Sequence, residues 1–233
     1  MARYEEVVGA YLDAIETRRV RGLAVDRVAS VAGFLVEPVD TIVDRTIEAM
    51  LQTSSGPAAR SGLDGLVGRV AVANAKLAYA RFAQVFSPAD DRWDKLVGGG
   101  ARPQRLIWTD TDVHDSKRRD VLYVEELIAP ETVVALSPTT LAAFREHGEA
   151  RAATATEGLD EATAIIQAVS DVGIDLGYLS RQLEDDCIKR LEAADRALLE
   201  DNSSLCAWNS PSHQRNLGHG SRCDRSPADG QES

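Results

Sequence analysis

Apolar side chains recur with helical spacing in the first twenty residues and in two later segments. Between residues 4 and 20 they stand three or four positions apart, which places them on one face of an α-helix. The same spacing returns over 39–51 and in a longer stretch that ends near Phe86, so two further helices are expected. The Ser, Gly, Pro and Ala residues of 53–62 predict a loop between them.

Three short runs of apolar and β-branched residues interrupt this helical spacing. They cover 27–36, 105–108 and 132–136, and each predicts a strand. The first run ends at Glu37 and Pro38, where a proline stops strand pairing. Its small and β-branched residues are typical of a buried strand.

Helix signals follow the second and third runs. Asp115 or Ser116 is expected to cap a helix after the second run. After the third run, Ser137, Pro138 and Gly148 stand where the N-cap, the first residue and the C-cap of a helix would. Because strands alternate with helices, and the connections are too long for hairpins, the chain is predicted to be α/β with parallel strands.

The sequence from Leu159 onward contains two helical stripes and no strand pattern. From about residue 202 it becomes rich in Ser, Gly, Asn, Arg and Pro, a composition that buries too little apolar surface to fold. The predicted organisation is therefore a folded part over 1–201 with a helical end, followed by a disordered tail over 202–233.

The charge balance narrows the range of partners. With 26 Lys and Arg against 37 Asp and Glu, the net charge is −11, which disfavours nucleic acid and anionic membrane surfaces. No stretch approaches the roughly 20 apolar residues that span a bilayer, and the first residues lack a secretory signal pattern. Three irregularly spaced cysteines do not form a disulfide framework. A cytoplasmic protein is expected.

Five blocks of this sequence resemble, in the same order, the C-terminal half of bacterial transaldolases. They are VASVAGFLVEPVDTIVD, VAVANAKLAYARF, GARPQRLIW, LYVEELIAPETVVALSPTTLAAFREHG and GIDLGYLSRQLEDD. The resemblance covers about 1–195 and implies the C-terminal portion of a (β/α)8 TIM barrel, whose active site lies at the carboxyl ends of the strands. The three strands would be the sixth, seventh and eighth, and the chain would begin after the fifth.

The family's chemistry implies what this chain would do. Transaldolases transfer a dihydroxyacetone unit between sugar phosphates in the pentose phosphate pathway, without a cofactor, through a Schiff base on a lysine of the fourth strand. By the resemblance, that lysine and the acid–base carboxylates precede Met1. The lysines present are expected to be solvated surface residues: Lys76, Lys95, Lys117 and Lys189. No catalytic residue is therefore assigned, and the chain alone is expected to be inactive.

The pocket positions of the family differ here. A family pattern close to VASVASFFVSRVDT appears as VASVAGFLVEPVDT, which puts Gly33 in place of a pocket serine and Pro38 in place of a phosphate-binding arginine. A pattern like WASTSTKNP appears as WTDTDVHDS, with Asp110 and Asp112 in place of hydroxyls. Losing an arginine and gaining carboxylates makes such a pocket repel a phosphate dianion.

Two clusters raise the question of a metal. On an extended chain Asp110, Asp112 and His114 would share one face and could hold Mn²⁺, Fe²⁺ or Zn²⁺. Solvated side chains with a helix cap explain them better, so no metal is expected. A zinc set in the tail lacks the short paired spacings of a structural site; its members are Cys206, His213, His219 and Cys223.

Two hypotheses remain open from the sequence. The first is a truncated, diverged member of the transaldolase family that acts on sugar phosphates. The second is a non-catalytic remnant or accessory module that pairs with an upstream barrel half or with itself, because strand edges and apolar faces made for a barrel attract a partner.

Overall fold

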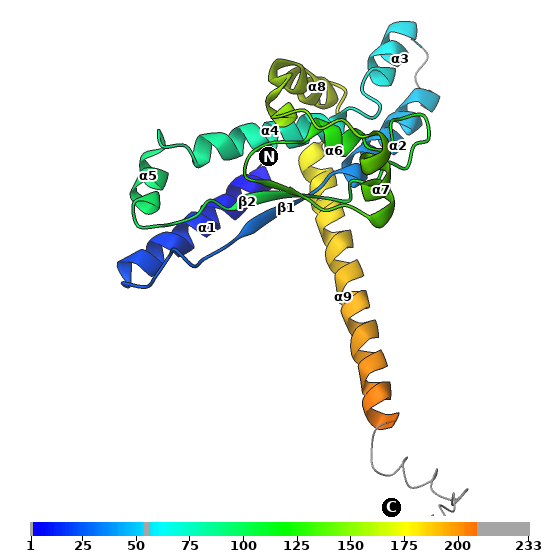
Figure 1. The fold of residues 1–233 in the computed structure, drawn as a ribbon. Coiled ribbons are helices and arrows are strands. Elements are labelled where there is room, and N and C mark those ends of the chain that lie inside the picture. Colours follow the sequence, from blue (N-terminus) through cyan, green and yellow to red (C-terminus); the bar gives the residue numbers. More distant parts are fainter. Residues whose placement is uncertain (1, 54–55, 209–233) are drawn as a thin grey trace, which may run out of the picture. The chain divides into compact units, whose positions relative to one another are not determined.

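The computed structural model describes residues 2–53 and 56–208 (Figure 1). The chain divides into two compact units, the first ending at Leu183 and the second beginning at Glu184, inside the last helix. In chain order the elements are α1 (Ala2–Val20), β1 (Val31–Leu35), α2 (Glu37–Thr53), α3 (Pro57–Asp64), α4 (Val70–Val85), α5 (Asp91–Val97), β2 (Arg105–Thr109), α6 (Leu122–Glu126), β3 (Thr132–Val134), α7 (Pro138–His147), the short 3₁₀ helix η1 (Thr154–Thr156), α8 (Leu159–Asp171) and α9 (Leu176–Trp208).

The three strands form one parallel sheet in the order β1-β2-β3. Phe34 of β1 is in register with Trp108 of β2, and Trp108 is in register with Val134 of β3. Helices separate the strands along the chain, as parallel pairing requires. The predicted α/β class and parallel strands are confirmed.

One face of the sheet is more deeply buried than the other. Phe34 and Trp108 stack edge to face on the buried side, and Tyr4 of α1 packs on Phe34 with 5.3 Å between ring centroids. Side chains alternate along a strand, so Val31 and Gly33 lie on the opposite side, where Val31 is 55% exposed. The prediction of a buried strand over 27–36 is therefore wrong in length, because the strand covers only Val31–Leu35, and wrong in burial at Val31 and Gly33, which are exposed.

Helix α1 packs by the apolar stripe that its sequence predicts. Leu12 and Ile15 are buried in the core, and the Tyr11 hydroxyl donates to the carbonyl of Arg102 at 2.6 Å. The polar side of α1 pairs with α5, where the Arg92 guanidinium binds Glu16 at 2.7 Å.

Two helices were not expected from the sequence. Helix α3 occupies part of the predicted loop, with Pro57 in the first turn, where a missing N–H is harmless. Helix α5 is capped by Asp90, whose carboxylate accepts hydrogen bonds from the N–H groups of Arg92 and Trp93. Both are short and carry too few apolar positions to show a period.

The predicted caps had opposite outcomes. Ser137 accepts a hydrogen bond from the Thr140 N–H, Pro138 begins α7, and Gly148 follows its last residue, as expected. The expected cap at Asp115 or Ser116 is wrong, because α6 begins only at Leu122 without a side-chain cap. Asp115 instead accepts from the Lys117 N–H and forms an ion pair with Arg118.

The predicted helical C-terminus is confirmed by α8 and α9. Helix α9 continues to Trp208, so the tail boundary expected near 202 falls inside it; Leu198 and Leu205 keep a helical seven-residue spacing across that point. The rest of the expected tail, 209–233, lies outside the described residues. In the part that the structure describes, no helix is long and apolar enough to cross a membrane.

Candidate functional site

The segments that follow the three strands lie side by side at the carboxyl ends of the sheet. The Glu37 N–H, after β1, donates to the carbonyl of Asp110, after β2, at 2.9 Å. The Thr111 hydroxyl donates to the carbonyl of Ala135, after β3, also at 2.9 Å. Ligands of parallel α/β sheets bind at this edge, so it is the candidate site, and we call it the strand-end site.

Glu37 and His114 join the first two segments in a side-chain pair. The His114 Nδ1 lies 3.1 Å from a Glu37 carboxylate oxygen, and the side chains are 74% and 12% exposed, respectively. The Thr41 hydroxyl, one turn along α2, donates to the same carboxylate. Glu37 is the first residue of α2, where the helix dipole favours a negative charge.

Asp112 is fixed by the start of α7. Its carboxylate accepts hydrogen bonds from the Ser137 hydroxyl at 2.7 Å and from the Thr140 hydroxyl. The bond from Thr140, then that from Ser137, and the nearby His114 together lower the pKa of Asp112, against a smaller effect of burial. Asp112 is therefore an ionised, half-buried carboxylate held by hydroxyl groups at the start of α7.

Asp110 lacks the extended backbone conformation that would place Asp110, Asp112 and His114 on one face. Its φ is +52°, a left-handed conformation that is uncommon outside glycine, and its side chain is exposed. The alternation of Asp110, Asp112 and His114 is consequently lost. Among the residues that the structure describes, no three His, Cys, Asp or Glu side chains are placed to hold a metal ion.

The tail set lies beyond the described side chains: Cys206, His213, His219 and Cys223. The structure therefore leaves that hypothesis untested.

Gly33 is the middle residue of β1, and Pro38 lies just after the carboxyl end of that strand. A Cβ added at Gly33 would meet only the Ile107 Cγ2, at the ordinary contact distance of 3.8 Å, so the fold does not require glycine there. Pro38 is the second residue of α2 and is half-buried. Neither residue offers a side-chain donor, whereas Glu37, Asp110 and Asp112 contribute three carboxylates.

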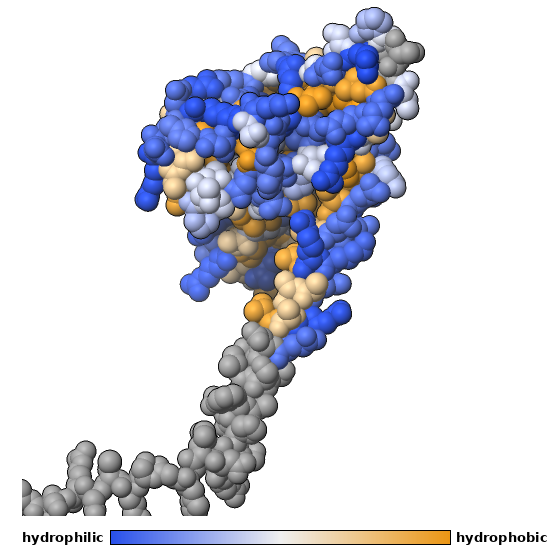
Figure 2. Space-filling model, turned by 90° about the vertical axis from the view of Figure 1, so that its right-hand side faces the viewer, coloured by the Kyte–Doolittle hydropathy of each residue, from blue (hydrophilic) through white to orange (hydrophobic). Residues whose placement is uncertain are grey.

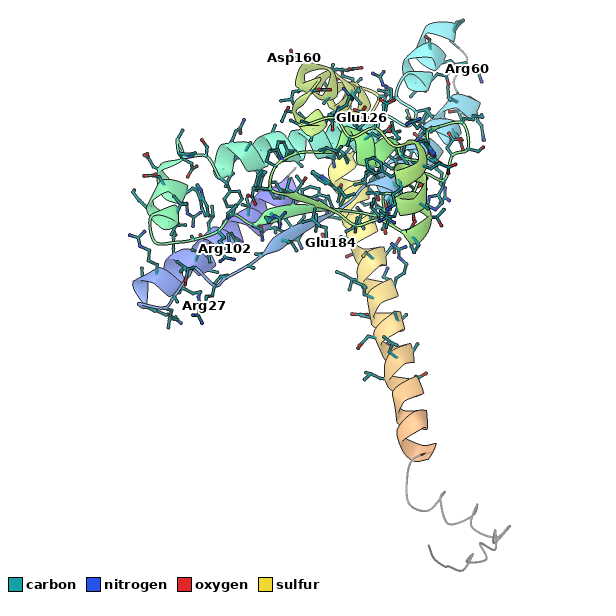
Figure 3. The ribbon with its side chains drawn as sticks, viewed as in Figure 1. Arg27, Arg60, Arg102, Glu126, Asp160 and Glu184 are labelled. Atoms are coloured by element: carbon teal, nitrogen blue, oxygen red, sulfur yellow. The ribbon has the colours of Figure 1, made fainter. Side chains whose placement is uncertain are left out.

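Of the four lysines, Lys76 departs from the expectation of a solvated side chain. It is 8% exposed, and its ammonium lies 2.7 Å from the Glu126 carboxylate (Glu126 is labelled in Figure 3). The pair lines a groove of about 200 Å³ with apolar walls that include Leu122 and Ile165. Three lysines are exposed, as predicted: Lys95, Lys117 and Lys189.

Sequence reasoning missed a buried charge cluster next to the strand-end site. Asp40, 1% exposed, accepts from the Ala71 N–H at 2.7 Å and from the Tyr123 hydroxyl at 2.8 Å. The Arg118 guanidinium lies 2.6 Å from Asp44 and 3.4 Å from Asp40. Burial raises the pKa of Asp40, against these hydrogen bonds. We call these residues the Asp40 cluster.

Gly68 makes room for this cluster. Its φ is +70°, and an added Cβ would fall 1.9 Å from the Arg118 guanidinium carbon. The Gly68 N–H donates to Asp44 at 2.9 Å. The spacing of Asp40 and Asp44, one helical turn apart on α2, is the one sequence signal that pointed to a shared partner.

Figure 2 shows a largely hydrophilic face of the molecule with hydrophobic side chains reaching the surface in places. Large exposed apolar residues of the first unit include Val31 of β1 and Leu141 of α7, which is 40% exposed. Apolar surface is thus present outside the strand-end site.

Comparison with known proteins decides the family. The sequence profile described as Transaldolase/Fructose-6-phosphate aldolase matches residues 3–202. The chain belongs to this family. The expected resemblance to transaldolases is confirmed.

Similar curated proteins carry transaldolase names. "Transaldolase 1" of Streptomyces coelicolor is 39% identical over 199 residues, which is 85% of this chain and 50% of that protein. "Transaldolase 1" of Streptomyces avermitilis is 37% identical over 203 residues, or 86% and 50%. "Transaldolase" of Mycobacterium tuberculosis is 36% identical over 199 residues, or 85% and 51%. The chain spans about half the length of the curated relatives that it matches.

Proposed function

We propose that this chain supplies three strands of a transaldolase-type (β/α)8 barrel that transfers a dihydroxyacetone unit between sugar phosphates. One observation carries the proposal: in a member of this family, three parallel strands in sequential order bring their carboxyl-end segments together at one polar edge. In TIM barrels this edge holds the active site. Among the described strands, β1 is an outer strand that pairs with β2 alone, so its other edge fits a sheet that continues into further strands.

The reactive lysine of such an enzyme would come from outside the described strands. A Schiff-base lysine needs a desolvated amine without a fixed counter-charge. Lys76 is buried, but Glu126 neutralises it on the helices, and Lys95 and Lys117 are exposed. Residues 1–233 alone are therefore expected not to form the covalent intermediate.

The charges of the strand-end site disfavour the binding of a phosphate group. Glu37, Asp110 and Asp112 bring negative charge to the strand-end site, and Pro38 stands where the family pattern has an arginine. Asp112 is held ionised by its two hydroxyl donors. A phosphate dianion meets repulsion here instead of a charge-assisted bond.

A second candidate follows from the same charges: a non-catalytic module that keeps the family's fold and completes or covers a barrel. The carboxylates and the missing arginine are the observations that support this second candidate. The two candidates differ in whether a barrel containing this chain forms a covalent intermediate.

The test uses borohydride, which reduces a Schiff base to a stable amine. A chimera would join residues 3–202 to the half of Streptomyces coelicolor Transaldolase 1 that lies outside the matched region, with the natural enzyme as control. We expect an adduct with fructose 6-phosphate on the Streptomyces half of the chimera and none on residues 1–233 alone. A folded chimera without any adduct would favour the second candidate, and an adduct on Lys76, Lys95, Lys117 or Lys189 would overturn both.

A further inference from the structure

Helix α9 changes its environment along its length. It is drawn in Figure 1 as one uninterrupted helix. In the first unit, Leu176, Leu179 and Leu183 pack against the hydrophobic core. In the second unit four large apolar side chains are exposed: Ile188 (47%), Leu191 (64%), Leu198 (63%) and Leu199 (62%). The second unit therefore presents apolar side chains that no described residue buries.

Two of these four side chains, Leu191 and Leu198, follow a heptad repeat. Leu191 and Leu198 are seven residues apart, as are Cys187 and Ala194, so these four residues take the a and d positions of successive heptads. We call them the α9 seam. Ile188 falls at position e and Leu199 at position b, so both lie outside the seam.

The heptad positions on the outer side of the helix are mostly polar, as in a coiled coil. Positions b, c and f face away from a partner helix, and most of them carry charges: Asp185, Asp186, Lys189, Glu192, Arg196 and Glu200. Lys189 and Asp186 form an ion pair of 3.4 Å within this outer surface. The charged side and the seam thus lie on different sides of one helix.

The charges that flank the seam select the partner. In a parallel coiled coil, position g of one helix meets position e of the next heptad on the other helix, five residues later. Arg190 occupies g and Asp195 occupies e, so two copies in parallel place opposite charges together. An antiparallel pair would set Arg190 against another g residue, Arg190 or Ala197, and would lose this match.

We propose that the α9 seam binds the same seam of a second copy of this chain, as a parallel, in-register two-stranded coiled coil. This association goes beyond the proposed transferase role and does not depend on it. Cys187, a free and half-buried thiol, then faces the partner's Cys187 at a d position, within disulfide reach.

The first experiment tests orientation with that thiol. In the full chain carrying C206S and C223S, sedimentation should give about twice the monomer mass of 25.2 kDa. Oxidised glutathione should then convert most of the dimer to a disulfide-linked form, since it takes up the two electrons and two protons released by the thiols. A monomer, or a dimer that does not cross-link through Cys187, would overturn the proposal.

The second experiment distinguishes association through the α9 seam from nonspecific hydrophobic association. L198D and L199D place the same charge on neighbouring, equally exposed positions. L198D should weaken association at least tenfold, whereas L199D should leave it unchanged. R190D should also weaken the dimer, and R190D combined with D195R should restore it. Equal effects of L198D and L199D, or failure of the charge swap to restore association, would overturn the proposed parallel seam.

Discussion

Two groups of charged residues each include side chains of α2, and they differ in how deeply they are buried. The Asp40 cluster is buried, and its donors and acceptors meet within the protein: Asp40 alone accepts from Ala71 and Tyr123 and lies beside Arg118. One turn earlier, Glu37 faces the strand-end site and pairs with His114, whose ring is mostly exposed. The first group holds elements together, and the second is open to a ligand. Charge by itself does not distinguish the two roles; burial and the number of fixed partners do.

Removing the buried carboxylate should have the largest effect on stability. D40A leaves the Ala71 N–H and the Tyr123 hydroxyl without an acceptor and takes a counter-charge from Arg118, so we expect a loss of about 3–5 kcal/mol. The exposed Glu48, on the same helix, supplies a control, and E48A should change the free energy of unfolding by under about 0.5 kcal/mol. Urea titrations would measure both. Similar small losses would contradict the structural role of the Asp40 cluster.

Breaking the ion pair between Lys76 of α4 and Glu126 of α6 should have the next largest effect on stability. K76M leaves the Glu126 carboxylate, 29% exposed, without its close partner, and we expect a loss of about 1–3 kcal/mol in thermal or urea unfolding. Combining K76M with E126L should recover most of it, because an apolar pair of similar size replaces the ion pair. The exposed Lys95 is the matched control. A K95M variant as unstable as K76M would refute the assigned burial of Lys76.

Asp112 should make a smaller, pH-dependent contribution. Its folded-state pKa is lowered, chiefly by the hydrogen bond from Thr140, so its stabilisation is present above the unfolded value of about 3.9 and is lost as the pH falls through the folded value. D112N should therefore cost about 1 kcal/mol at pH 7 and less at pH 3. Unfolding curves at the two pH values decide this. A D112N penalty that grows toward acid would contradict the lowered pKa.

The Glu37–His114 pair at the strand-end site should matter least for folding, because the His114 ring is mostly exposed. H114Q removes a ring that is 74% exposed, and exposed ion pairs contribute about 0–1 kcal/mol. We expect a change in unfolding free energy below about 0.5 kcal/mol. A loss as large as that of D40A would mean that His114 has a structural role like that of the Asp40 cluster.

Elements with a regular spacing of apolar residues could be predicted from the sequence. Elements that depend on contacts between distant parts of the chain could not. The stripe of α1, the three parallel strands and the cap at Ser137 depend on local patterns. Helix α5, at 91–97, depends on one carboxylate cap and the burial of Trp93 and Leu96, which no period reveals. The exposure of Val31 and Gly33 in β1 could not be predicted, because burial depends on which elements cover them.

The candidate site was predicted in composition but not in geometry. The replacements at Gly33, Pro38, Asp110 and Asp112 are visible in the sequence, and the last three lie in segments that follow the strand ends. The hydroxyl donors of Asp112 stand 25 and 28 residues away on the chain, and the left-handed conformation of Asp110 has no local sequence signal. Contacts of this kind arise only from the fold.

We propose that this chain keeps the barrel architecture of its family and that its strand-end site binds phosphate weakly. The most direct measurement is the concentration of fructose 6-phosphate that half-saturates borohydride trapping in the chimera, with and without E37S and P38R. We expect these changes, which restore an arginine and remove a carboxylate, to lower that concentration about tenfold to a hundredfold. They should leave trapping with unphosphorylated fructose unchanged. Equal half-saturation in both chimeras would contradict the account.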